Sequence, residues 1–346
     1  MTVRITKPEI NVREKLAELD KPSGIAGEAM LRAETPQEQQ ALIGVGRRNL
    51  LINGAFQVWQ RGTSSTSFTG STRGYIADRW SFRFATSAER STDVPEGEAF
   101  KYSLKVVVAS TSPDAFIIQA IEDSDRFAGQ TVTFSYWIKP SESCETRADY
   151  WRGGHGTHKL NGGVWQKVTN TFVVPSDITV NEFLYIQFPA NKVITFYVTG
   201  IQLEIGKVAT PFEHRSYGEE LALCQRYFEV IGDEYSTDPS GASVTETLIG
   251  LGFVYQASTV FGHLYWKVTK RINPTCTINH ATDLQCLSSA GGGAWIDASS
   301  ASIRANKSSA RLTIVTSLAM AGTGTACEIR FDSASPVGYI YIDAEL

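Results

Sequence analysis

Apolar and polar residues alternate in short segments from Asn49 onward, which is the pattern of β-strands with one buried face. In the segment 131–138, Thr-Val-Thr-Phe-Ser-Tyr-Trp-Ile, every second residue is apolar, and Trp137 is the exception on the polar face. Gly, Ser, Asn and Pro separate nine such segments: 50–52, 55–60, 80–84, 102–109, 115–121, 131–138, 165–174, 183–188 and 193–203. Because no helical period lies between them, the pattern predicts an antiparallel β-sandwich or jelly roll over residues 49–215.

A short helical period over Gly218–Phe228 interrupts the strands and leads into a second strand-rich region. Its apolar segments are 247–255, 262–268, 275–278, 301–304, 311–315, 326–332 and 338–344. They predict a second β-sandwich over residues 216–346, with a short leading helix. The expected fold class is therefore all-β: two antiparallel β-sandwich or jelly-roll domains preceded by a short helical N-terminal attachment segment. A chain of 346 residues has room for two such cores.

Residues 1–48 have a different composition, with eight basic residues, seven acidic residues and no Phe, Tyr or Trp. Such a segment buries too little apolar surface to fold alone. Two short helices are predicted within it, one over residues 11–20 and one after the capping box at 35–38, each with a single apolar stripe. The stripe residues are Val12, Leu16, Leu19, Leu42 and Ile43. We expect these residues to attach the chain to a larger assembly, and a disordered tail is the alternative.

Charge and hydrophobicity argue against two classes of partner, nucleic acid and membrane. The formal net charge is −4, and no cluster of Lys and Arg is longer than the pair Arg47-Arg48, so no surface is expected to neutralise a row of phosphates in nucleic acid. A membrane span needs about 18 consecutive apolar residues, and no stretch of the sequence is that long; no signal peptide is expected at the N-terminus either.

The five cysteines are an odd number and widely spaced, so we expect reduced, mostly buried thiols in a chain that folds in a bacterial cytoplasm.

Aromatic and polar residues gather in the middle of the first β region, as they do in sites that stack on sugar rings. The candidate glycan-contacting residues are Trp137, Tyr150, Trp151, Arg152 and Trp165. Residues 150–154 are predicted to form a loop, and Trp137 lies on an otherwise polar strand face. Aromatic residues packed into the core give the same pattern, so packing remains the alternative for each of them.

Metal and catalytic motifs are weak. His155 and His158 have no second ligand pair at a recognised spacing, so no transition-metal site is predicted. The segment Glu122-Asp-Ser-Asp125 offers oxygen ligands for a structural calcium ion but lacks the full series of ligands, and no other cofactor is expected. No nucleophile elbow, zinc-hydrolase motif, phosphate-binding loop or β-helix repeat occurs, so no catalytic residue is assigned and a non-enzyme is predicted.

Several segments carry a family resemblance. Residues 49–62, Asn-Leu-Leu-Ile-Asn-Gly-Ala-Phe-Gln-Val-Trp-Gln-Arg-Gly, and 77–80, Ala-Asp-Arg-Trp, resemble the opening of the jelly-roll domain of many phage tail-fibre and related virion proteins. Residues 198–213 and 219–228 are similar to its closing strand and the link to the next domain. The C-terminal region resembles these proteins near 271–274 and at 341–346, and residues 1–48 resemble attachment segments of podovirus-type fibres.

This resemblance implies a non-enzymatic and usually trimeric appendage whose jelly roll is similar to carbohydrate-binding modules, some of which hold structural calcium. The predicted function is a structural virion protein of a tailed bacteriophage, assembled in the host cytoplasm. Its N-terminal segment would bind other virion proteins of the tail or capsid, and its β-sandwiches would adhere to a host-surface glycan. Two alternatives remain: a capsid-decorating or head-fibre protein with no host ligand, and a glycan depolymerase.

Overall fold

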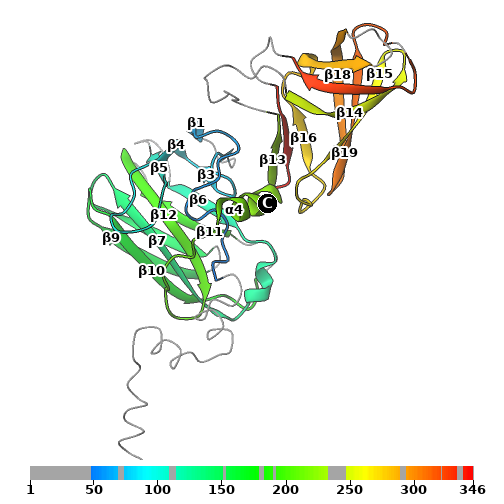
Figure 1. The fold of residues 1–346 in the computed structure, drawn as a ribbon. Helices are drawn as coiled ribbons and strands as arrows, with labels where there is room; N and C mark the ends of the chain where they lie inside the picture. The colour runs from blue at the N-terminus through cyan, green and yellow to red at the C-terminus, as the bar shows by residue number, and fades with distance from the viewer. Residues whose placement is uncertain are drawn as a thin grey trace, which may run out of the picture.

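The computed structural model describes residues 48–68, 74–108, 114–150, 153–178, 183–189, 192–232, 247–288, 294–320, 322–332 and 338–345. It shows two β-rich bodies joined near the helix α4 (Tyr217–Gln225), as Figure 1 shows. All the strand pairs in the described residues are antiparallel, so the predicted all-β class is confirmed. The five residues of the predicted N-terminal stripes lie outside the described residues, and so does nearly all of the segment 1–48.

The first body is a sandwich of two six-stranded sheets, A and B. Sheet A has the order β1 (Ser64–Phe68), β4 (Ala85–Ser91), β5 (Ser103–Val108), β12 (Ile194–Ile205), β7 (Thr131–Pro140) and β10 (Gln166–Val173). Sheet B has the order β2 (Gly74–Tyr75), β3 (Ser81–Arg83), β6 (Ala115–Ala120), β11 (Phe183–Phe188), β8 (Cys144–Tyr150) and β9 (Gly153–Leu160). The 3₁₀ helix η1 (Ser124–Phe127) lies between β6 and β7.

The core lies between these sheets because each strand turns its apolar residues inward. In β7, the four alternate residues Val132, Phe134, Tyr136 and Ile138 are at most 1% exposed. Phe188 of sheet B meets Phe196 of sheet A across the interior, with ring centroids 4.2 Å apart. Where a strand was predicted at the correct position, the alternation of apolar and polar residues therefore also identified the face that points into the core.

The segment 49–60 differs from the prediction, since it contains no strand although two were expected there. Leu51, Phe56 and Val58 are fully buried in irregular backbone. Asn53 and Phe56 have positive φ angles of 58° and 51°, which a pleated strand does not accept. Gly54 packs so close to β12 that a Cβ atom would lie 2.0 Å from the Ile201 carbonyl oxygen.

Five strands of the sandwich were not predicted: β1, β2, β4, β8 and β9. They contain few large apolar residues, and β9 reads Gly-Gly-His-Gly-Thr-His-Lys-Leu. Of the predicted loop at 150–154, Tyr150 ends β8 and Gly153 and Gly154 begin β9, and residues 151 and 152 lie outside the described residues. Pairing with neighbouring strands, which an isolated segment does not reveal, decides their conformation.

The second body consists of a small sheet and a closed barrel. The small sheet has the order β13 (Phe228–Ile231), β21 (Ile340–Asp343) and β16 (Thr275–Ile278). The barrel has the order β14 (Thr247–Gln256), β15 (Thr259–Tyr265), β19 (Ser309–Thr316), β18 (Trp295–Ala305), β17 (Leu284–Ser288) and β20 (Ala326–Phe331). The 3₁₀ helix η2 (Ala281–Asp283) precedes β17.

The barrel corrects the expectation of a second sandwich. Strand β20 pairs with both β14 and β17, which closes the sheet on itself instead of dividing it into two layers. Gly252 and Gly262 face each other across β14 and β15, and a Cβ atom on either would lie within 3 Å of the Ile329 side chain. These glycines make room for Ile329 inside a narrow barrel, where small and large residues must alternate.

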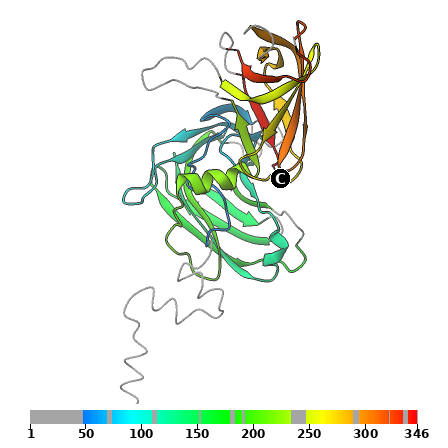
Figure 2. The same cartoon turned by 45° about the vertical axis from the view of Figure 1, so that its right-hand side comes forward.

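Ion pairs and a returning C-terminus join the two bodies. Arg79 of the sandwich forms an ion pair with Glu345, and the Arg61 guanidinium lies 3.4 Å from the centre of the Phe228 ring. Figures 1 and 2 both place the C-terminus beside this junction.

Lys270 and Glu229, 2.5 Å apart and at most 1% exposed, form a buried pair within the second body. The division at residue 216 stays a prediction.

All five cysteines are free thiols; Cys144 and Cys276 are half-buried, and the other three are buried. Among the described residues, no helix has the length and hydrophobicity of a membrane span.

Candidate functional site

Two of the five predicted glycan-contacting residues, Trp137 and Trp165, come together on the outer face of sheet A. Trp137 lies in β7 on the face opposite the core residues, and Trp165 immediately precedes β10; both are half-buried. Tyr150 ends β8 in sheet B, where its side chain is not described, and Trp151 and Arg152 lie outside the described residues. Their predicted roles stay predictions.

An ion pair holds two aromatic rings of this face, those of Trp165 and Tyr197, in place. The Lys139 ammonium forms an ion pair with Asp93 and lies 4.7 Å from the Tyr197 ring centroid and 5.5 Å from that of Trp165. The Trp165 indole Nε1 donates a hydrogen bond of 3.0 Å to Asp93 Oδ1, and its ring meets Tyr197 edge-on, with centroids 6.5 Å apart. We call Trp137, Lys139, Trp165, Tyr197 and Asp93 the sheet A patch.

Strand register extends the patch across four strands. Trp137 pairs with Thr199 of β12 and Lys139 pairs with Tyr197, so both outward-facing residues of β7 lie beside the same strand. On the far side of Tyr197, Lys105 of β5 donates a hydrogen bond of 2.5 Å to Glu89, which raises the pKa of Lys105. Indole and phenol rings therefore alternate with charged groups along one face. Rings can stack on the apolar faces of sugars while charged groups bind hydroxyls.

Sequence reasoning did not single out Tyr197, Lys139 or Asp93. A signal for Tyr197 was present, since alternation within 193–203 turns Phe196 and Val198 inward and Tyr197 outward. No such signal marked Asp93, which lies 46 residues before Lys139 and reaches the patch from the loop after β4. Only the folded chain brings these residues together.

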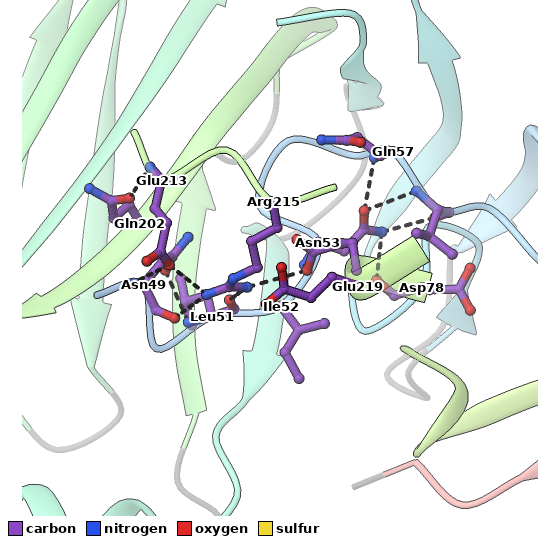
Figure 3. A network of polar contacts seen from close by, with 12 residues as sticks. Asn49, Leu51, Ile52, Asn53, Gln57, Asp78, Gln202, Glu213, Arg215 and Glu219 are labelled. Atoms are coloured by element: carbon purple, nitrogen blue, oxygen red, sulfur yellow. Dashed lines mark hydrogen bonds and ion pairs between the residues drawn. The ribbon is translucent and has the colours of Figure 1, made fainter. Parts of the chain in front are cut away.

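The segments that carry the family resemblance form a structural joint around Arg215, seen in Figure 3. Its guanidinium, 5% exposed, pairs with Glu213 at 2.9 Å and with Glu220 at 3.4 Å, and it donates a hydrogen bond of 2.5 Å to the Asn49 carbonyl. The Asn49 side chain in turn accepts a hydrogen bond from the Leu203 backbone N–H. The start of the sandwich is thereby tied to its closing strand and to the segment leading into α4.

Asn53 forms the second half of this joint. Its side-chain oxygen accepts hydrogen bonds from the Gln57 and Val58 N–H groups, and its amide nitrogen donates to the Val58 and Asp78 carbonyls. The Trp80 indole donates to the Asn53 carbonyl. Asn53 therefore has a structural role, since it joins the backbone at residues 57–58 to Asp78 and Trp80.

The candidate calcium ligand Glu122 is engaged by protein groups. Arg226 and the Tyr227 hydroxyl donate hydrogen bonds to its carboxylate at 2.6 Å and 2.5 Å. Burial raises the pKa of Glu122, but these hydrogen bonds outweigh burial and leave it below its ordinary value. In the part of the chain that the structure describes, no three His, Cys, Asp or Glu residues are grouped to hold a metal ion. The calcium expectation stays a prediction.

No protein-family model and no curated protein matches this chain. Solved structures that match part of this chain include the enzymatically active domain of bacteriophage CBA120 tailspike protein 4. It matches at 14% identity and a TM-score of 0.33, over 46% of this chain and 21% of that one. They also include a putative sugar-binding protein from Bacteroides thetaiotaomicron, at 13% identity and a TM-score of 0.31, over 46% of this chain and 100% of that one. The C-terminal family 22 carbohydrate-binding module of Clostridium thermocellum Xyn10B matches at 16% identity and a TM-score of 0.28, over 42% of this chain and 100% of that one. Because the identities and TM-scores are low, no function follows from these likenesses.

Proposed function

We propose that this protein is a non-enzymatic virion appendage of a tailed bacteriophage that binds a host-surface glycan through the sheet A patch. The observation that supports this function is the group of half-exposed rings of Trp137, Trp165 and Tyr197 on one sheet face, where Lys139 and Asp93 hold Trp165 and Tyr197 in place. Rigid aromatic platforms flanked by charged groups suit sugar rings, because little side-chain entropy is lost on binding.

A glycan array of bacterial surface polysaccharides, probed with the full chain, tests this proposal. Binding to at least one polysaccharide is expected, and Tyr197→Ala or Trp137→Ala weakens it about fivefold or more, because an aromatic contact contributes about 1 kcal/mol. Tyr265→Ala is the matched control, since this tyrosine is 76% exposed but lies on the barrel. A blank array at high protein concentration, or equal loss in the control, would contradict the proposal.

The proposal includes assembly as a homotrimer through the outer face of the barrel. On β14, Leu251, Phe253 and Tyr255 are 65%, 38% and 48% exposed. Exposed apolar residues on a monomer are usually scattered singly over the surface, so three on one strand indicate an interface. Glu328 lies beside Leu251 at one edge, and Arg311 lies over Phe261 at the other. A face with an acidic edge and a basic edge is complementary to a second copy of itself in a closed ring.

Light scattering tests the assembly. The mass expected for the full chain is about three times 37.9 kDa, and Leu251→Glu shifts it toward the monomer. Val208→Glu is the control because Val208 is 56% exposed on the sandwich. A monomer near 37.9 kDa in the unmodified chain would remove the trimer from the proposal.

The virion role itself depends on residues 1–48, which we propose bind neighbouring tail or capsid proteins. A chain that begins at residue 49 is expected to keep its β-sandwich yet fail to join virions, whereas normal incorporation would exclude this role. The alternatives have separate outcomes. A decorating protein without a host ligand would leave the glycan array blank, and a depolymerase would release reducing ends from host polysaccharide.

A further inference from the structure

A pocket whose lining residues differ from those of the sheet A patch lies near the start of α4. Its volume is about 280 Å³, and it is lined by Gln57, Trp59, Arg90, Lys101, Tyr102 and Tyr217. None of these residues belongs to the patch. The volume is close to the lower limit for small-molecule sites, about 300 Å³, so the pocket suits one or two rings of a saccharide, whose other rings would lie outside it.

Two cations in this pocket lack a carboxylate partner among the described residues. The Arg90 guanidinium lies 4.6 Å from the Tyr102 ring centroid, and the Lys101 ammonium lies 5.3 Å from the same centroid. Both side chains are exposed and form no ion pair with any described residue. Two like charges that share one ring repel each other, so an anion placed between them would be stabilised by both.

The other walls of the pocket suit a saccharide. Trp59, Tyr102 and Tyr217 supply three aromatic rings, and Tyr217 is 57% exposed. The side-chain amide of Gln57 has no hydrogen-bond partner among the described residues, so it is available to sugar hydroxyls.

The pocket is held in shape by the joint around Asn53. The Gln57 backbone N–H donates a hydrogen bond of 2.8 Å to the Asn53 side chain, and Figure 3 shows these two residues together. The Trp59 indole donates a hydrogen bond of 2.6 Å to the Phe56 carbonyl. Preorganised walls lose less entropy when a ligand binds.

We infer that this pocket binds an anionic saccharide, with the sugar carboxylate between Arg90 and Lys101 and a sugar face on the aromatic rings. The pocket differs from the sheet A patch in its charge, since the patch cation Lys139 is already neutralised by Asp93. The inference rests on the proposed function only in taking a saccharide as the ligand. The two sites can therefore fail independently.

Calorimetry with the full chain and two matched probes tests the inference. Tetragalacturonate carries carboxylates, and its fully methyl-esterified form is neutral with the same ring structure. We expect tetragalacturonate to bind and the ester to bind about tenfold or more weakly, because a charge-assisted hydrogen bond contributes about 1.5 kcal/mol or more. Raising sodium chloride from about 0.1 M to about 1 M is expected to remove the preference, because the screening length falls from about 10 Å to about 3 Å.

The double variant Arg90→Gln and Lys101→Gln is expected to lose the preference for tetragalacturonate. Arg304→Gln is the matched control, since Arg304 is exposed on the barrel. Equal affinity for both probes, no binding of tetragalacturonate, or full affinity in the double variant would each overturn the inference. Binding of acetate as tightly as tetragalacturonate would also overturn it, because the site would then select an anion and no sugar. Loss of array binding in Tyr197→Ala, with tetragalacturonate binding unchanged, separates the patch from the pocket.

Discussion

Replacement of Arg215 by methionine tests whether burial or distance decides the strength of an ion pair in this protein. Arg215 and its partner Glu220 have side chains that are 5% and 7% exposed, and their closest atoms are 3.4 Å apart. The surface pair Lys105–Glu89 is closer, at 2.5 Å, but its side chains are 32% and 43% exposed. A ranking by distance and a ranking by burial therefore predict opposite orders for the two pairs.

The expected magnitudes differ clearly. Arg215→Met leaves Glu220 buried without its cation and removes the donor to the Asn49 carbonyl, so it is expected to lower the free energy of unfolding by about 3–5 kcal/mol. Lys105→Met removes an exposed pair, in which water already stabilises both charges, and is expected to cost about 0–1 kcal/mol. Methionine has a similar apolar stem to each side chain, so packing changes little.

Urea unfolding, followed by tryptophan fluorescence and far-ultraviolet circular dichroism, measures both variants against the unmodified chain. Adding Glu220→Gln to Arg215→Met is expected to restore part of the lost stability, because it removes the uncompensated charge. A loss of less than about 1 kcal/mol in Arg215→Met, or a larger loss in Lys105→Met, would refute the burial argument.

Three other substitutions are expected to change stability. Gly200→Ala should lower the stability measured in thermal unfolding by about 1–3 kcal/mol, because the φ angle is 62° and the added Cβ atom would lie 2.5 Å from the Phe100 ring. Gly163→Ala is the control, since nothing lies within 4 Å of its added Cβ atom, and a smaller loss in Gly200→Ala than in this control would contradict the prediction. Burial raises the pKa of Cys286 to about 12, so the unfolded chain loses the thiol proton at a lower pH than the folded chain, and stability falls above pH 9.0. Between pH 8 and pH 11, the melting temperature of Cys286→Ala should therefore fall less than that of the unmodified chain. Identical falls in the two proteins would contradict this prediction. Lys270→Met leaves Glu229 charged and buried and should destabilise by about 3–5 kcal/mol in urea unfolding, a loss that Glu229→Gln partly reverses.

In the sandwich, the strands rich in large apolar residues could be predicted from the sequence and those with few could not, whereas in the second body β13 and β17 were missed despite their apolar residues. Residues 183–188 match β11 in full because the alternate apolar residues Leu184, Ile186 and Phe188 indicate a strand with one buried face. Strand β9, with three glycines, has no such signal and exists because β8 lies beside it. The buried segment at 49–60 shows the converse error, since its apolar residues fill the core from irregular backbone.

The candidate sites were predictable to a smaller extent. Trp137 was found because it is an aromatic residue on a polar strand face, which alternation reveals. Trp165 was predicted because it is aromatic. Its hydrogen bond to Asp93 could not be predicted, because the two residues are 72 positions apart in the sequence. The pocket of Gln57, Arg90 and Tyr217 gathers residues from three distant segments, so no local pattern could indicate it.

The sequence by itself determined the all-β class and the inward face of the long strands, because alternation of apolar and polar residues acts between neighbours along the chain. Only the tertiary structure decided that the second β region closes into a barrel, since closure depends on pairing β20 with both β14 and β17. It also decided which charges are neutralised. Lys139 meets Asp93 and Arg215 meets Glu213, while Arg90 and Lys101 meet no carboxylate among the described residues, because ion pairing depends on distances in space rather than along the chain.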